Sequence, residues 1–172
     1  NTKEGPYKDV TFSPDQIYEL RIAAYMHDIG KVTSPVEIVE KAKKLQTIFD
    51  RIQYIRLRMA YISQRIVLEG QNTKIEILQN SADSEKLKAL ETETHNKLEV
   101  IKEIREFINK CNEPGEFLDD ETLERLKEIS QKTYIDDEEK QQPFLKDDEL
   151  VNLSIRRGSI TEAERKKMQD HA

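Results

Sequence analysis

The fold class predicted from the sequence is all-α, and both the composition and the spacing of apolar residues support it. The 172 residues include five Gly, five Pro and no Trp, and 36% of them are charged. Glu, Lys, Leu, Ile and Arg dominate, which favours long helices over sheets. From Leu45 to Ile66 apolar residues recur at alternating spacings of three and four, which is typical of one helix face.

The first helix is predicted from Ser13-Pro14-Asp15-Gln16, where Ser13 can cap, Pro14 suits the first turn and Gln16 can complete a capping box. Gly30 is the expected stop, so His27 and Asp28 fall on the last turn. One face, which we expect to be packed, carries Ile17, Leu20, Ala23, Ala24 and His27.

A second helix is expected from about Pro35 to at least Glu69, a length of about 50 Å at 1.5 Å per residue. Charged residues such as Lys43 and Lys44 flank its apolar stripe and are expected to be solvated. The 3,4 spacing serves packing within one chain and packing across a dimer equally well, so both remain open. The stripe consists of Leu45, Ile48, Ile52, Ile55, Met59, Ile62 and Ile66.

The polar segment 80–84 is the expected tip of a helical hairpin, because it holds several residues that can cap a helix. A return helix of similar spacing should run to Cys111 and end at Asn112-Glu113-Pro114-Gly115. We therefore expect a long antiparallel, coiled-coil-like hairpin. The return stripe contains Leu87, Leu90, Thr94, Lys97, Ile101, Ile104, Ile108 and Cys111.

Shorter helices are predicted after the hairpin. Asp119 or Asp120 can cap the first, a charged loop spans 136–142, and another helix covers about 147–155. Thr161-Glu162-Ala163-Glu164 then predicts a last helix, opened by a capping box, that reaches His171.

Charge and cysteine content exclude several classes of protein. A net charge of −6 argues against a surface that tracks nucleic-acid phosphates. Cys111 is the only cysteine, so an internal disulfide is excluded and a reducing compartment is expected. No apolar run approaches the ~20 residues that span a bilayer. We expect a cytoplasmic chain with no nucleic-acid polymer or membrane as partner.

The chemistry in this sequence centres on His27-Asp28-Ile29-Gly30-Lys31. Neutral imidazole and carboxylate both bind divalent transition metals, and a carboxylate can bridge two ions that activate water and hold phosphoryl oxygens. Two ligands do not hold a metal ion by themselves. The residues therefore predict part of a metal site for phosphate-ester hydrolysis.

Two stretches resemble the HD-GYP subgroup of the HD-domain metal-dependent phosphohydrolases. Residues 23–32, AAYMHDIGKV, resemble the apolar helix that ends in HD-x-GK, and residues 153–165, LSIRRGSITEAER, with His171 resemble the turn and helix that lead to a metal-binding His. The runs at 35–45 and 47–52 are similar to the helical insertion found in some sensor-linked HD proteins.

The resemblance implies roles for four residues. His27, Asp28 and His171 would be metal ligands, with Asp28 as the bridge, and Asp28 and Lys31 would serve catalysis. An ammonium such as that of Lys31 can stabilise charge developing on a phosphate. The family implies a centre of Fe or Mn, with Mg, Ni or another divalent metal as alternatives, and hydrolysis of cyclic di-GMP or another nucleotide in bacterial signalling.

The family pattern also includes an earlier His, a His-His pair, a Gly-Tyr-Pro segment and a later Asp, and none of these occurs in matching positions. We therefore expect an incomplete site that binds metal weakly and turns over little substrate. The domains would be the start of an HD domain at 1–34, a hairpin insertion at 35–115, and at 116–172 short helices that return to an HD domain truncated after the last helix.

An alternative function is a non-catalytic module of a sensor protein that transmits signals and forms a homodimer through the hairpin. Simpler roles are also available to single residues. Lys31 can interact with a helix macrodipole, His95 can be a solvated surface residue, and Cys111 can be a small buried hydrophobe.

Overall fold

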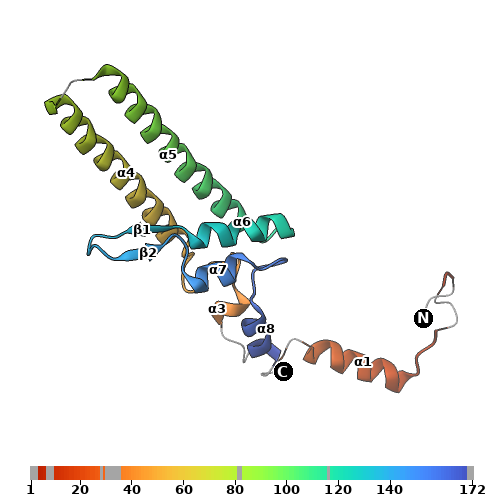
Figure 1. Ribbon diagram of the computed structural model, residues 1–172. Helices are drawn as coiled ribbons and strands as arrows, with labels where there is room; N and C mark the ends of the chain where they lie inside the picture. The colour runs from red at the N-terminus through yellow and green to blue at the C-terminus, as the bar shows by residue number, and fades with distance from the viewer. Residues whose placement is uncertain are drawn as a thin grey trace. The chain divides into compact units, whose positions relative to one another are not determined.

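The computed structural model describes residues 4–6, 10–27, 29, 36–80, 83–115 and 117–169, and these are mostly helical, as predicted. The chain divides into two compact units, Asn1–Val39 with Glu162–Ala172 and Glu40–Thr161. The elements, shown in Figure 1, are α1 (Pro14–Met26), α3 (Val36–Val39), α4 (Ile52–Asn80), α5 (Ser84–Cys111), α6 (Asp120–Gln131), β1 (Thr133–Ile135), β2 (Gln141–Pro143), α7 (Asp147–Leu153) and α8 (Glu162–Gln169).

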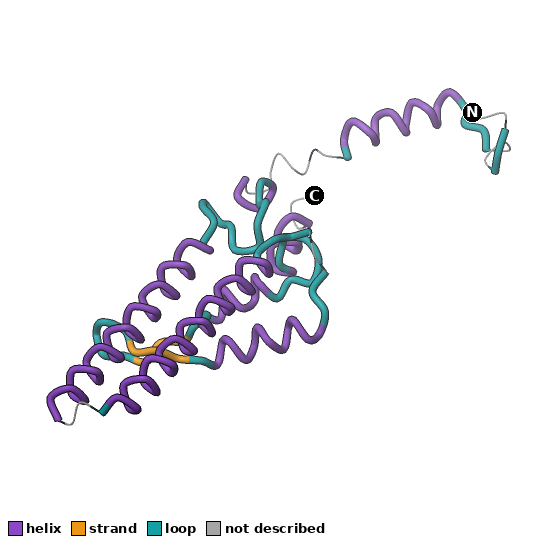
Figure 2. The backbone as a smooth tube through the Cα atoms, turned by 90° about the horizontal axis from the view of Figure 1, so that it is seen from above, coloured by secondary structure: helices purple, strands orange, loops and turns teal. Residues whose placement is uncertain are grey.

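Helices α4 and α5 lie side by side and run in opposite directions, as both views show (Figure 1, Figure 2). Helix α4 ends at Asn80 and α5 begins at Ser84, and Asp83 caps α5 by accepting from the backbone of Glu85 at 2.9 Å. Lys74 Nζ lies 2.7 Å from Glu91 Oε1 across the pair. The side chains buried in these helices are Ile52, Ile55, Met59 and Ile62 of α4 and Ile101, Ile104, Ile108 and Cys111 of α5.

The elements that follow α5 cover the end of the α4–α5 pair that contains Ile52 and Cys111. Leu126 and Ile129 of α6, Leu153 of α7 and the segment Phe144-Leu145 join the same apolar cluster as the hairpin residues. Tyr134 on β1 contacts Tyr61 and Phe144 edge to face, with ring centroids 5.9 and 6.2 Å apart. The core of the Glu40–Thr161 unit therefore lies at this end of α4 and α5.

A buried ion pair holds α7 against α4. Arg58 donates from Nη1 to Glu149 Oε2 at 2.7 Å and from Nη2 to Oε1 at 3.0 Å, and Nη1 also donates to the carbonyl of Phe144 at 2.9 Å. Burial acts to lower the pKa of Arg58, but the hydrogen bond and charge of Glu149 outweigh it and raise the pKa overall. Breaking such a pair typically costs about 3–5 kcal/mol, because one charge stays buried alone.

The predicted helix from Pro35 to Glu69 is wrong in its first half. Helix α3 ends at Val39 and α4 begins at Ile52, where Asp50 Oδ1 accepts from the Ile52 amide at 3.0 Å. Asp50 followed three residues later by Gln53 is a capping signal that the apolar spacing masked. Leu45 is nevertheless fully buried, whereas Ile48 is 93% exposed.

Two further predictions are corrected by the structure. The charged loop predicted at 136–142 ends earlier, because Gln141 and Gln142 belong to β2, which pairs antiparallel with β1. The turn between the strands is built on Asp136, whose Oδ1 accepts from the Lys140 amide at 2.8 Å. The face of α1 that was predicted to be packed is exposed, including Ile17 at 52% and Leu20 at 52%. Because the described part of α1 buries none of its side chains, capping rather than packing defines this helix locally.

Gly70 lies inside α4, where the helix continues to Asn80, and close packing explains the glycine. A Cβ on Gly70 would lie 2.9 Å from Thr94 Oγ1 and 3.3 Å from Thr94 Cγ2, both on α5. Thr94 therefore occupies the space that a side chain at position 70 would need.

Replacing Gly70 with Ala should lower the free energy of unfolding by about 1 kcal/mol, because the clash outweighs the gain of roughly 0.8–1 kcal/mol in helix propensity. Urea unfolding should show that Thr94→Ala rescues Gly70→Ala, with a coupling above about 0.5 kcal/mol in a double-mutant cycle. Gln71→Ala, at an exposed neighbouring position, is the control. Additive effects of the two substitutions would contradict this packing.

Candidate functional site

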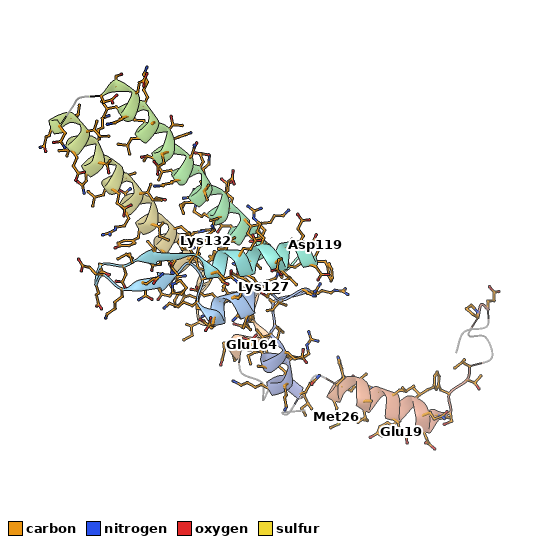
Figure 3. The ribbon with its side chains drawn as sticks, viewed as in Figure 1. Glu19, Met26, Asp119, Lys127, Lys132 and Glu164 are labelled. Carbon is orange, nitrogen blue, oxygen red and sulfur yellow. The ribbon has the colours of Figure 1, made fainter. Side chains whose placement is uncertain are left out.

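Helix α1 carries the first candidate ligand, and its ends are well defined. Ser13 Oγ accepts from the Gln16 amide at 3.2 Å, and the Ser13 amide donates to Gln16 Oε1 at 2.9 Å, so the predicted capping box forms. The helix ends at Met26, labelled in Figure 3, and the backbone amide of His27 donates to the Ala23 carbonyl at 2.8 Å.

The His27 ring is exposed, and its Nδ1 lies 2.5 Å from the carbonyl oxygen of Ala24. A carbonyl only accepts, so in the neutral ring Nδ1 carries the proton and Nε2 carries the lone pair. Metal-binding histidines commonly donate their second ring nitrogen to a backbone carbonyl in this way. The geometry therefore fits a His that binds a metal ion through Nε2.

The other predicted site residues, Asp28, Lys31 and His171, lie outside the described residues. Within the described ranges no group of three or more His, Cys, Asp or Glu side chains is arranged to hold a metal ion. His95, on α5, is exposed, in agreement with the surface role predicted for it. His27 is thus the predicted metal ligand whose side-chain contact the structure describes.

The second stretch that carried the resemblance forms a turn followed by a helix. Gly158 has φ +81°, a left-handed conformation that glycine adopts without strain. Ser159 Oγ donates to the Lys41 carbonyl at 2.6 Å, and α8 begins at Glu162, directly after Thr161 as predicted. Lys41 Nζ in turn donates to Asn152 Oδ1 at 2.9 Å.

A buried polar cluster lies where segment 40–51 meets the end of α5. Asn112, which is 2% exposed, accepts from the Leu45 amide through Oδ1 at 2.9 Å and donates from Nδ2 to Asp50 Oδ2 at 3.0 Å. Its carbonyl accepts from the Lys44 amide at 3.3 Å. One side chain thereby fixes the segment against α5 and positions the carboxylate that caps α4.

Lys44 was expected to be solvated, and this is wrong: its side chain is fully buried. Among the described residues its Nζ has no hydrogen-bond partner. Desolvation lowers the pKa of the Lys44 amine, and the charge of the nearby Cys111 offsets part of this effect. Sequence reasoning missed Lys44 because its backbone lies against Asn112, which is far along the chain. Cys111 is 2% exposed, so its predicted burial is confirmed.

Cys111 also borders a hollow of about 580 Å³ between α5 and α6. Arg125 Cζ lies 4.4 Å above the Phe107 ring on its wall. The remaining lining residues are Glu103, Glu106, Lys110, Phe117, Leu118 and Thr122. The thiol therefore borders a cavity with cationic, anionic and aromatic side chains.

Searches of protein-family models, curated proteins and solved structures found no match to this chain. No helix in the described part of the chain combines the length and the apolar character needed to cross a bilayer. The side chains themselves must therefore carry any functional assignment.

Replacing Asn112 with Ala should lower the free energy of unfolding by about 2–3 kcal/mol, since it leaves the Leu45 amide unpaired and the Asp50 carboxylate without its amide donor. Asn109→Ala is the matched control, because Asn109 is half-buried and accepts a single side-chain bond, from Arg56. Urea unfolding of both variants measures the difference. Equal effects would show that Asn112 has no special role.

Proposed function

We propose that this chain is part of an HD-type metal-dependent phosphohydrolase in which a coiled-coil-like helical hairpin unit interrupts the HD domain. The observation that best supports the proposal is the division of the chain. Asn1–Val39, with the stretch that resembles HD-x-GK, and Glu162–Ala172, with the helical part of the second stretch and His171, group in one unit. Glu40–Thr161 forms the other unit and includes residues 153–161 of the second stretch. Segments far apart in sequence thus belong together in the way that an insertion requires.

In this proposal His27, Asp28 and His171 bind the metal, and Lys31 neutralises charge on the phosphate of a cyclic dinucleotide such as cyclic di-GMP. Bound Fe or Mn would supply an activated water and Lewis acidity. The contact between His27 Nδ1 and the Ala24 carbonyl supports the first role, since it orients the ring and selects the tautomer whose lone pair is on Nε2.

Loss of the His27 imidazole should weaken metal binding. Titration of the chain with Mn²⁺, followed by the electron paramagnetic resonance signal of free Mn²⁺, should show weak binding that His27→Ala weakens by about tenfold or more. His95→Ala, which removes an exposed imidazole from α5, should leave the affinity unchanged.

Identical effects of the two His substitutions would overturn the assignment of His27. The sequence contains three His residues in total and lacks the further ligands of the family pattern, so we expect little hydrolysis of cyclic di-GMP by this chain. Rapid turnover would contradict an incomplete site while leaving the phosphohydrolase proposal intact.

A second candidate function, an interaction module that forms a homodimer, is favoured by one observation on α4. Apolar residues also follow a heptad-like spacing on a second face of α4. This face points away from α5, because a position two residues from Met59 or Ile66 lies on the opposite side of the helix. The most exposed of them are Leu57 at 67%, Leu68 at 50%, Ile75 at 52% and Leu78 at 51%. A stripe with this repeat can pack against a second copy of itself.

Multi-angle light scattering tests this module. If the exposed stripe mediates a dimer, Leu68→Glu together with Ile75→Glu should convert it to a monomer, because charges would be buried between the helices. Val100→Glu, at an exposed apolar position of α5, should leave the mass unchanged. A wild-type mass equal to that of one chain at all concentrations would contradict the module.

A further inference from the structure

Lys44 and Cys111 are brought together although neither belongs to the proposed metal site. The amide of Lys44 donates to the carbonyl of Asn112 at 3.3 Å, so the backbone of Lys44 lies beside the residue that follows Cys111. The lysine side chain is fully buried, and its amine interacts electrostatically with Cys111. A nucleophilic group and a base thus share one buried junction.

The amine of Lys44 has no acceptor in the described structure, which is unfavourable for a buried ammonium. It can remain a neutral amine, or it can take the proton of a nearby thiol and gain a thiolate as counter-ion. Both states avoid an isolated buried charge. The thiolate is the form of cysteine that reacts with electrophiles.

We propose that Cys111 is a site of thiol–disulfide exchange, that Lys44 is its proton acceptor, and that the adjoining cavity admits a small zwitterionic disulfide. The cavity of about 580 Å³ lies within the range of roughly 300–1,000 Å³ that is typical of small-molecule sites. Cys111 is one of the residues that line this cavity.

The cavity walls determine the class of disulfide. Lys110 and Arg125 can bind carboxylates, Glu103 and Glu106 can bind an ammonium group, and Phe107 and Phe117 contribute apolar surface. A disulfide that carries both carboxylates and ammonium groups complements this mixture. Further charged groups near the junction are Lys43, which pairs with Glu113, and Asp50, which pairs with Asn112.

The exchange step is balanced without any further oxidant. The Lys44 amine takes the thiol proton, and the Cys111 thiolate attacks one sulfur of the small disulfide. A new S–S bond forms at Cys111 as the S–S bond of the reagent breaks, and the second half of the reagent leaves as a thiolate that accepts a proton. The protein thiol is oxidised, and half of the small disulfide is reduced.

Intact-mass spectrometry of the full chain with glutathione disulfide as the probe tests the proposal. Because Cys111 is the only cysteine, each adduct reports on this site, and Cys111→Ser must give none. Lys44→Met keeps a long buried side chain but removes the amine. It should slow adduct formation at pH 7 by about tenfold or more and should move the midpoint of the pH–rate profile upward.

Lys127→Met is the matched control, because Lys127 lies on the exposed face of α6 (Figure 3) and pairs with Glu124 at 3.2 Å. It should react at the wild-type rate. Circular dichroism checks that both Met variants are folded, and Lys44→Met should be at least as stable as the wild type because it buries no amine. Equal rates for Lys44→Met and wild type, or an unchanged pH midpoint, would overturn the role of Lys44.

A second probe tests recognition by the cavity. Bis(2-hydroxyethyl) disulfide is uncharged, so Cys111 should react faster with glutathione disulfide than with this second probe. Arg125→Gln should remove most of the difference between the two rates. Failure of the wild type to react with either disulfide would overturn Cys111 as a modification site. Equal rates for the two probes would overturn the zwitterionic class of ligand.

Discussion

The Asn112 side chain is the contact on which the Glu40–Thr161 unit depends most. The backbone amide of Asn112 donates to the Ile108 carbonyl at the end of α5. Its side chain holds segment 40–51 through Leu45 and orients the Asp50 carboxylate that begins α4. The side chain of Asn112 therefore joins segment 40–51 to the end of α5 and to the residue that caps α4.

Local signals in the sequence were sufficient for most helices, whereas long-range contacts caused some of the errors. Ser13 and Asp83 cap helices through neighbours in sequence, so α1 and α5 could be predicted from short segments. The break before Ile52 has a local capping signal at Asp50, which the apolar spacing masked. The burial of Lys44 is different, because its backbone lies against Asn112, which is distant in sequence. Strands β1 and β2 have three residues each, which is too short for an alternating pattern to be recognised.

The candidate site could be predicted from the sequence as a set of residue types, but not as a geometry. The His-Asp dipeptide and the Gly-Lys that follows identify the chemistry, and the structure adds the contact that selects the tautomer of His27. Asp28, Lys31 and His171 remain predictions, since they lie outside the described residues. Cys111 and Lys44 show the opposite case, in which neither residue was predicted to serve a site and their proximity comes from folding alone.

The hydrogen bond between Ser159 and the Lys41 carbonyl joins the two ends of the Glu40–Thr161 unit. Domains whose ends are close together can be inserted into another domain with little disturbance. A folded insertion of this kind adds little loop-closure entropy to its host, whereas the same residues unfolded would form a long loop. In the proposed HD protein, folding of the interrupted unit would therefore be coupled to folding of the insertion.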